Sequence, residues 1–139
     1  MRIAVIGLRT LSVPDLGAYL PEGTTGSISG GAKGVDTSAR KYALAHHLPL
    51  TELRPDYRRY RKGAPLKRTI EIIERADFVL IFWDSTSKGT RYAIEQCEKL
   101  GVDYRVYRRE GAVGEVTAKK GEPPARVRPL FSYAENSPL

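Results

Sequence analysis

The fold is decided by residues 25–48, which read TGSISGGAKGVDTSARKYALAHHL. The stretch opens with a predicted short strand, Thr25–Ser29, and continues into a helical pattern, Val35–Leu48, in which Val35, Ala39 and Ala43 share one face. Three glycines within five residues join the two elements. A strand that enters a helix through a glycine-rich turn is the first half of a βαβ unit, so it predicts a parallel sheet.

The same alternation extends along the chain in both directions. Strands are predicted at Arg2–Ile6, Leu50–Leu53, Phe78–Trp83 and Val102–Tyr107, and helices at Val13–Leu20, Pro65–Ala76 and Thr90–Leu100. The spacing of the two last helices predicts inward faces made of Leu66, Ile70 and Ile73, and of Ala93, Cys97 and Leu100. We therefore expect an α/β fold, a Rossmann-like three-layer sandwich with a mostly parallel sheet of about five strands.

Beyond Arg109 the periodicity is lost, and glycine and proline interrupt a polar stretch. A length of 139 residues fits one domain, which we place at residues 1–109. Residues 110–139 are predicted to be a tail that is either flexible or folded into a small hairpin of Val113–Thr117 and Ala125–Leu130.

The composition indicates the cellular compartment of the protein and the class of partner that it binds. Cys97 is the single cysteine, so no intrachain disulfide can form, which fits a reducing compartment. No apolar run approaches the roughly 18 residues that a membrane span needs. We expect a cytoplasmic protein without a membrane partner, and exposed helix faces are compatible with a homodimer. The net charge of +7 favours anionic partners.

Positive charge gathers between residues 54 and 68, where Tyr57 and Tyr60 interleave with the cations. Such a stretch is either a phosphate-and-stacking surface for nucleic acid or a solvated loop. The residues proposed for nucleic-acid contact are Arg58, Arg59, Arg61, Lys62, Lys67 and Arg68.

The chemistry is expected beyond the carboxyl ends of the strands, where open α/β sheets bind ligands. Three turns lie there, at residues 7–10, 29–37 and 84–90. In the second turn, glycines allow close backbone approach, the following helix presents its N–H groups, and Lys33 adds positive charge. This combination is typical of a phosphate site. The alternatives are a tight turn that merely needs glycine, and capping roles for Asp36, Ser87 and Thr90.

The second turn is not one of the standard nucleotide motifs. Gly26 and Gly31 have the spacing of a P-loop, but Ala32 stands where the lysine is required. The sequence also lacks G-x-G-x-x-G. His46 and His47 are adjacent on a helix and form no recognised metal spacing with Cys97. No metal and no required cofactor are therefore predicted.

Residues 29–39, SGGAKGVDTSA, resemble the signature loop S-G-G-A-[RK]-G-[IV]-D of the DNA-processing protein family DprA (Smf). Residues 65–70 and 87–93 are similar to that family's basic segment and its serine- and glycine-rich turn. The stretch 1–107 resembles the wider SLOG superfamily, which joins DprA to the LOG phosphoribohydrolases, and within it the small stand-alone YspA-like proteins. The resemblance implies a Rossmann-like fold with an anion pocket for nucleotides or nucleotide-derived ligands, and DprA itself binds single-stranded DNA.

Two departures limit what the resemblance implies. LOG enzymes carry P-G-G-x-G-T-x-x-E, whereas residues 88–92 here read KGTRY and Glu95 lies one helical turn further along. Phosphoribohydrolase activity is therefore not inherited from the motif. The small relatives tend to have Gly-Ser-Arg at the first turn, where Leu8 here replaces the serine and Arg9 remains.

Three hypotheses follow from these residues. The first is a sensor or binding module for a nucleotide-derived phosphate ligand. Its predicted contacts are Gly7, Arg9, Ser29, Gly30, Gly31, Ala32, Lys33, Gly34, Asp36, Ser87, Gly89 and Thr90. The second is a hydrolase that cleaves an N-glycosidic or phosphate bond, with Asp36, Asp84 or Glu95 as acid or base. The third is DprA-like binding of single-stranded nucleic acid along residues 54–68 and in the same pocket.

Overall fold

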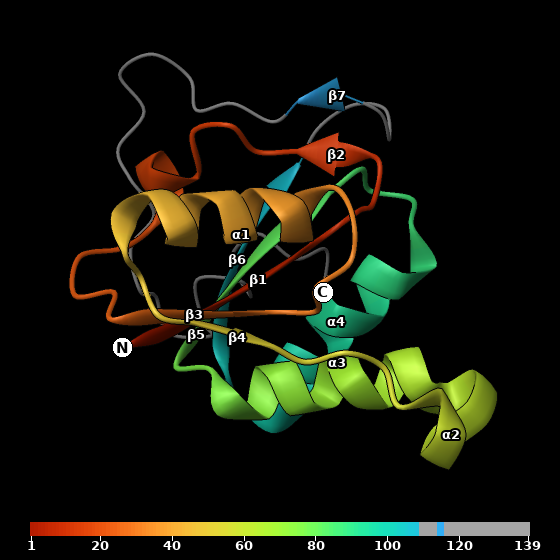
Figure 1. Cartoon of the computed structure of the whole chain (residues 1–139). Coiled ribbons are helices and arrows are strands. Elements are labelled where there is room, and N and C mark those ends of the chain that lie inside the picture. The colour runs from red at the N-terminus through yellow and green to blue at the C-terminus, as the bar shows by residue number, and fades with distance from the viewer. Residues whose placement is uncertain (109–113, 116–139) are drawn as a thin grey trace.

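A five-stranded parallel sheet forms the centre of the molecule (Figure 1). The computed structural model describes residues 1–108 and 114–115. The strands are β1 (Arg2–Gly7), β3 (Gly26–Ser29), β4 (Leu50–Glu52), β5 (Phe78–Trp83) and β6 (Asp103–Arg108), in the order β4-β3-β1-β5-β6. Every neighbouring pair in this sheet is parallel. The expected α/β sandwich is thereby confirmed.

Helices cover both faces of the sheet. Helix α1 (Val35–His46) lies on one face, and α3 (Ala64–Arg75) and α4 (Lys88–Leu100) pack together on the other. Strand β5 contributes side chains to both hydrophobic cores, because successive side chains of a strand point to opposite faces of the sheet. Phe78, Leu80 and Phe82 join the core under α1, while Val79, Ile81 and Trp83 join the core under α3 and α4. The absence of polar alternation in this strand therefore reflects burial on both faces.

The helix predicted at Val13–Leu20 is wrong, because residues 8–25, the described connection between β1 and β3, contain no α-helix. This connection consists of a two-residue strand, β2 (Leu11–Ser12), and one 3₁₀ turn, η1 (Leu16–Tyr19). Val13, Leu16 and Tyr19 are all buried, and their spacing of three matches the 3.0 residues per turn of a 3₁₀ helix. Pro14 and Gly17 disfavour a longer α-helix, so burial of these three side chains decides the local structure.

The two helices on the second face differ in detail from the predicted pattern. Leu66 and Leu100 are exposed rather than inward, with 45% and 39% of their surfaces accessible. Ile72 and Ile94 take inward positions instead, beside Ile73, Ala93 and Cys97. Leu66 lies in the first turn of α3 and Leu100 ends α4. At these two helix ends, spacing alone therefore does not predict burial.

The basic segment folds into two short helical turns, α2 (Tyr57–Tyr60) and η2 (Arg61–Gly63), which lead into α3. The carboxylate of Asp56 accepts a hydrogen bond from the amide of Arg59 (3.1 Å) and so caps α2. Neither turn contains a buried residue. The segment therefore adds no buried side chain to either core, and it contacts the start of α3, where Nζ of Lys67 lies 5.8 Å from the centre of the Tyr60 ring.

A short strand beyond the sheet, β7 (Gly114–Glu115), pairs in parallel with β2. The rest of the predicted hairpin, including Ala125–Leu130, lies outside the described residues. Among the described helices, none combines the length and the hydropathy that a bilayer-spanning segment requires.

Candidate functional site

The first and second predicted turns meet at the carboxyl edge of the sheet. The chain leaving β1 passes to the α1 face, whereas the chain leaving β5 passes to the α4 face, so the two strands border a topological switch point. The amide of Val35 donates a hydrogen bond to the carbonyl of Leu8 (3.3 Å), which fixes the start of α1 against the first turn. The edge thus places the glycine-rich loop beside Arg9.

Gly34 is glycine for a backbone reason. Its φ is +69°, and a Cβ there would overlap the carbonyl oxygen of Leu8 and lie 2.5 Å from the backbone of Arg9. At Gly7, similarly, a Cβ would lie 2.5 Å from Cγ2 of Val35. At Gly34 the tight-turn alternative is therefore sufficient, because close packing against the backbone of the first turn demands glycine, and at Gly7 close packing of the Val35 side chain does the same.

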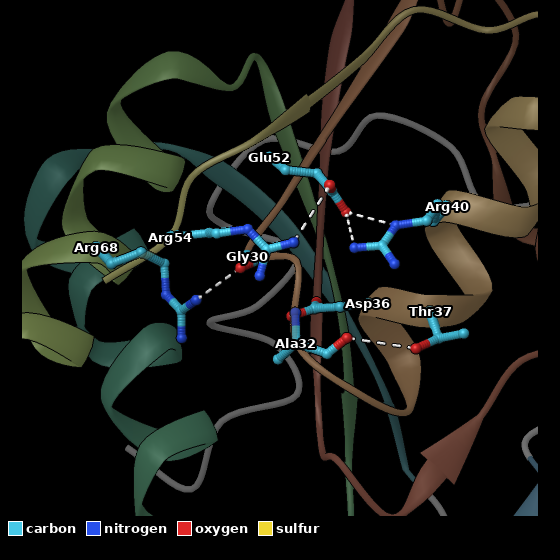
Figure 2. A network of polar contacts seen from close by, with 8 residues as sticks. All are labelled: Gly30, Ala32, Asp36, Thr37, Arg40, Glu52, Arg54 and Arg68. Carbon is cyan, nitrogen blue, oxygen red and sulfur yellow. Dashed lines mark hydrogen bonds and ion pairs between the residues drawn. The ribbon is translucent and has the colours of Figure 1, made fainter. Parts of the chain in front are cut away.

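Gly30 and Gly31 are different, because arginine side chains occupy the space next to them. Figure 2 shows Arg54 and Arg68 on the side of the loop that contains Gly30. Arg68 donates a hydrogen bond from Nη1 to the carbonyl of Gly30 (3.1 Å), and a Cβ on Gly30 would overlap that nitrogen. A Cβ on Gly31 would lie 3.2 Å from Cζ of Arg54. Two guanidinium groups, one following β4 and one from α3, therefore converge on the loop. We call Gly30–Gly34 with Arg54 and Arg68 the arginine cradle.

Asp36 closes the loop from within α1. Its Oδ2 accepts a hydrogen bond from the amide of Ala32 (3.1 Å), and the hydroxyl of Thr37 donates to the carbonyl of Ala32 (3.3 Å). Burial raises the pKa of Asp36, against the opposing effects of the Ala32 amide and the charge of Arg68. The geometry fits the capping interpretation of Asp36, whose carboxylate holds the turn in shape.

Positive charge exceeds negative charge in this network. Arg40 donates from Nε and Nη2 to the same Glu52 oxygen, at 3.0 and 2.8 Å. Arg54 lies 3.9 Å from the other oxygen of Glu52, and two thirds of its side chain is exposed. Burial lowers the pKa of Arg68, which Asp36 opposes and the charge of Arg9 reinforces. Glu52 thus neutralises mainly Arg40, and the donors of Arg54 remain accessible to an anion.

The third predicted turn is organised around Asp84. Its carboxylate accepts from the amides of Thr86 (3.0 Å) and Ser87 (2.8 Å) and from both of their hydroxyl groups. These hydrogen bonds, the Ser87 amide first, lower the pKa of Asp84 to about 2. The hydroxyl of Ser87 is thus engaged within its own turn. Thr90 is buried, whereas Gly89 is exposed and has open space where a side chain would stand.

The other predicted site residues lie at varied depths around this edge. Lys33 is exposed at the tip of the loop, and Glu95 is exposed in the middle of α4. Ser29 is fully buried at the end of β3, and its hydroxyl has no hydrogen-bond partner among the described residues. Most of the nucleic-acid set is exposed along the basic segment and the start of α3, namely Arg58, Arg59, Arg61, Lys62 and Lys67.

Sequence reasoning missed Arg54 as a cradle residue and assigned Arg68 to the nucleic-acid set rather than to the loop. Arg54 follows β4 by two residues, which places it at the ligand-binding edge of the sheet. It lies beside the loop because β4 neighbours β3, an order that the sequence does not reveal. Arg68 reaches the loop because α3 returns beneath β3, at a separation of 38 residues from Gly30.

A cleft of about 290 Å³ lies far from the cradle, near the end of α1 and the start of β3. It is lined by residues that include Leu20, Thr24, Tyr42 and His46. Within the described ranges, no three His, Cys, Asp or Glu side chains gather in a way that could hold a metal ion. Comparison with known family models, curated proteins and solved structures found no match to this chain.

Proposed function

We propose that this chain binds a phosphate-bearing ligand, a nucleotide or nucleotide derivative, at the arginine cradle. The observation that carries the proposal is the approach of Arg54 and Arg68 to Gly30 and Gly31, the two positions where a larger residue would displace them. Planar guanidinium groups match phosphate oxygens in pairs, so two of them beside a glycine loop suit a phosphate.

The backbone of the cradle supports the same ligand class. Among the hydrogen bonds between described residues, none uses the amide of Gly31, Lys33 or Gly34 as a donor. These amides precede α1, whose twelve residues add the positive end of the helix dipole. Because Arg54 keeps accessible donors, an incoming phosphate would meet both amide and guanidinium groups.

The loop resemblance supports a nucleotide rather than any other phosphate compound. Residues 29–36 resemble the signature loop of DprA, a family of the SLOG superfamily, whose members are thought to bind nucleotides or nucleotide-derived ligands. A cytoplasmic setting belongs to this proposal, since Cys97 is the single cysteine of the chain.

Binding is a better interpretation than hydrolysis, because the surroundings of the three proposed catalytic carboxylates do not suit an acid or base. Asp84, with its pKa near 2, is a poor proton carrier at neutral pH. Glu95 is exposed in the middle of α4. Asp36 is buried and occupied by the loop amide, so its loss would alter the cradle itself.

A thermal-shift screen tests the proposal directly. The panel contains mononucleotides, NAD, ADP-ribose, cyclic dinucleotides and a short oligonucleotide. A ligand at 100 times its dissociation constant stabilises the folded state by about 2.7 kcal/mol. We expect Arg54→Gln to weaken the best ligand by roughly 10- to 100-fold, since a charge-assisted hydrogen bond contributes about 1.5–3 kcal/mol. Gly31→Asp, which adds a negative charge inside the cradle, is expected to abolish binding.

Arg75→Gln is the matched control, because Arg75 is an exposed arginine at the far end of α3. It removes the same charge without touching the cradle. Equal affinities for Arg54→Gln and Arg75→Gln would contradict the role of the cradle, as would wild-type binding by a folded Gly31→Asp variant.

A second candidate function is binding of single-stranded nucleic acid along the basic segment. It is favoured by the exposure of this segment, in which α2 and η2 bury no residue and Tyr57 is 56% exposed. An exposed aromatic ring among cations suits base stacking and phosphate contact together. The affinity for a labelled oligonucleotide would then fall steeply with salt, and Tyr57→Ala would weaken it. No complex at low salt would exclude this function.

A further inference from the structure

A second cluster of cations lies at the other end of the same edge. The guanidinium carbon of Arg91, in the second turn of α4, lies 5.8 Å from the centre of the Trp83 ring. That of Arg108, the last residue of β6, lies 5.6 Å from the same ring. Trp83 is 8% exposed, and its indole nitrogen donates to the carbonyl of Ser87 (3.0 Å), so the ring is fixed. Both arginines are exposed.

Neither of these two cations forms an ion pair with a residue that the structure describes. The ion pairs among the described residues are those of Arg40 and Arg54 with Glu52, and neither involves Arg91 or Arg108. The nearby Asp84 directs its carboxylate to its own turn, where it accepts four hydrogen bonds. Two exposed cations held near one fixed ring, neither of them ion-paired with a described residue, raise the local positive potential and so favour an anionic group at this position.

The cluster and the cradle face the same ligand-binding edge. Gly30 follows β3 and Trp83 ends β5, two strands away, with β1 between them. Parallel strands lie about 4.8 Å apart, which places the two backbones roughly 10–12 Å from each other when the stagger between them is included. One elongated ligand can therefore reach both clusters.

We propose that Arg91 and Arg108, held on Trp83, form a second anion subsite, and that the ligand carries two phosphate groups separated by a nucleoside. This inference rests on the proposed function, because the first phosphate occupies the arginine cradle. It also reassigns the third turn: the hydroxyls of Ser87 and Thr90 are engaged or buried, and the cations beyond them contact the ligand.

The test compares ligands with one and two phosphates. The four ribonucleoside 5′-monophosphates and the corresponding 3′,5′-bisphosphates are titrated into the full-length protein by calorimetry. We expect at least one bisphosphate to bind about tenfold tighter than its monophosphate, because a single charge-assisted contact of about 1.5 kcal/mol gives that ratio. In Arg91→Gln/Arg108→Gln the bisphosphate is expected to bind no better than the monophosphate, whose own affinity stays unchanged.

Arg105→Gln is the matched control. Arg105 belongs to the same strand, is exposed, and stacks on Tyr107 at 5.7 Å instead of on Trp83. It is expected to leave the tenfold preference intact. Trp83 is the single tryptophan of the chain and lies beside both arginines, so its fluorescence in the folded protein is a local reporter of this subsite. A change in emission with the bisphosphate, and not with the monophosphate, would support the proposal.

The possible failures are distinguishable. Equal affinity of the wild type for mono- and bisphosphates would overturn the second subsite and leave the cradle standing. A preference that survives in Arg91→Gln/Arg108→Gln would also overturn the subsite, because other residues would then hold the second phosphate. No binding of any of the eight nucleotides would overturn the subsite, and it would overturn the cradle as well if NAD, ADP-ribose and the cyclic dinucleotides of the thermal screen also failed to bind.

Discussion

Replacement of Gly34 by alanine is the sharpest test of how the loop is built. Gly34 has a φ of +69°, and an added Cβ would overlap the carbonyl oxygen of Leu8 and crowd the backbone of Arg9. A non-glycine residue in such a conformation costs about 1–3 kcal/mol, and overpacking against a backbone that cannot yield adds about 1–3 kcal/mol. We therefore expect Gly34→Ala to lower the free energy of unfolding by about 2–6 kcal/mol.

Urea denaturation followed by Trp83 fluorescence measures this change. Gly89→Ala is the control, because Gly89 lies in the first turn of α4 with nothing within 4 Å of an added Cβ. It is expected to be neutral or to stabilise by up to about 1 kcal/mol, since alanine favours the helix. If Gly34→Ala remained within about 0.5 kcal/mol of the wild type, the tight packing of the loop on the first turn would be refuted.

Two further predictions concern ionisable groups. The pKa of Asp84 is about 2 in the folded state, below its ordinary 3.8, so its contribution to stability is complete above pH 3.8 and is lost as the pH falls toward 2. As the pH falls from 3.8 toward 2, the urea midpoint of Asp84→Ala should therefore drop less than that of the wild type. Parallel plots of midpoint against pH for the two proteins would contradict the hydrogen-bond network around Asp84. Burial raises the pKa of the Cys97 thiol to about 12, so alkylation at neutral pH should require unfolding. Rapid labelling of the native protein, detected by mass spectrometry, would show that α4 opens.

The strand and helix pattern was largely predictable because burial on both faces leaves a clear signature. Residues 78–83 are apolar throughout and form the strand that feeds both cores. The connection after β1 was mispredicted because Val13, Leu16 and Tyr19 are apolar at a spacing of three, which a sequence reader counts toward an α-helix. Its Pro14 and Gly17, together with core packing, select a 3₁₀ turn instead.

The candidate site was predictable only in its local part. The loop and its glycines are contiguous in sequence, so their shared geometry could be foreseen. Arg54 and Arg68 reach that loop through the order of the strands and the return of α3, which are long-range outcomes of packing. In the third turn, by contrast, residues predicted from their spacing to contact a ligand have structural roles. The hydroxyl of Ser87 donates to Asp84, and Thr90 is buried.

The most direct test of the arginine cradle is an amide chemical-shift titration of ¹⁵N-labelled protein with the best nucleotide from the thermal screen. The account predicts that the largest shifts fall on the amides of Gly30–Gly34 and at the start of α1, and that Arg54→Gln reduces them at equal ligand concentration. Largest shifts around Tyr42 and His46, which line the distant cleft, would contradict it and move the ligand to the opposite end of the sheet.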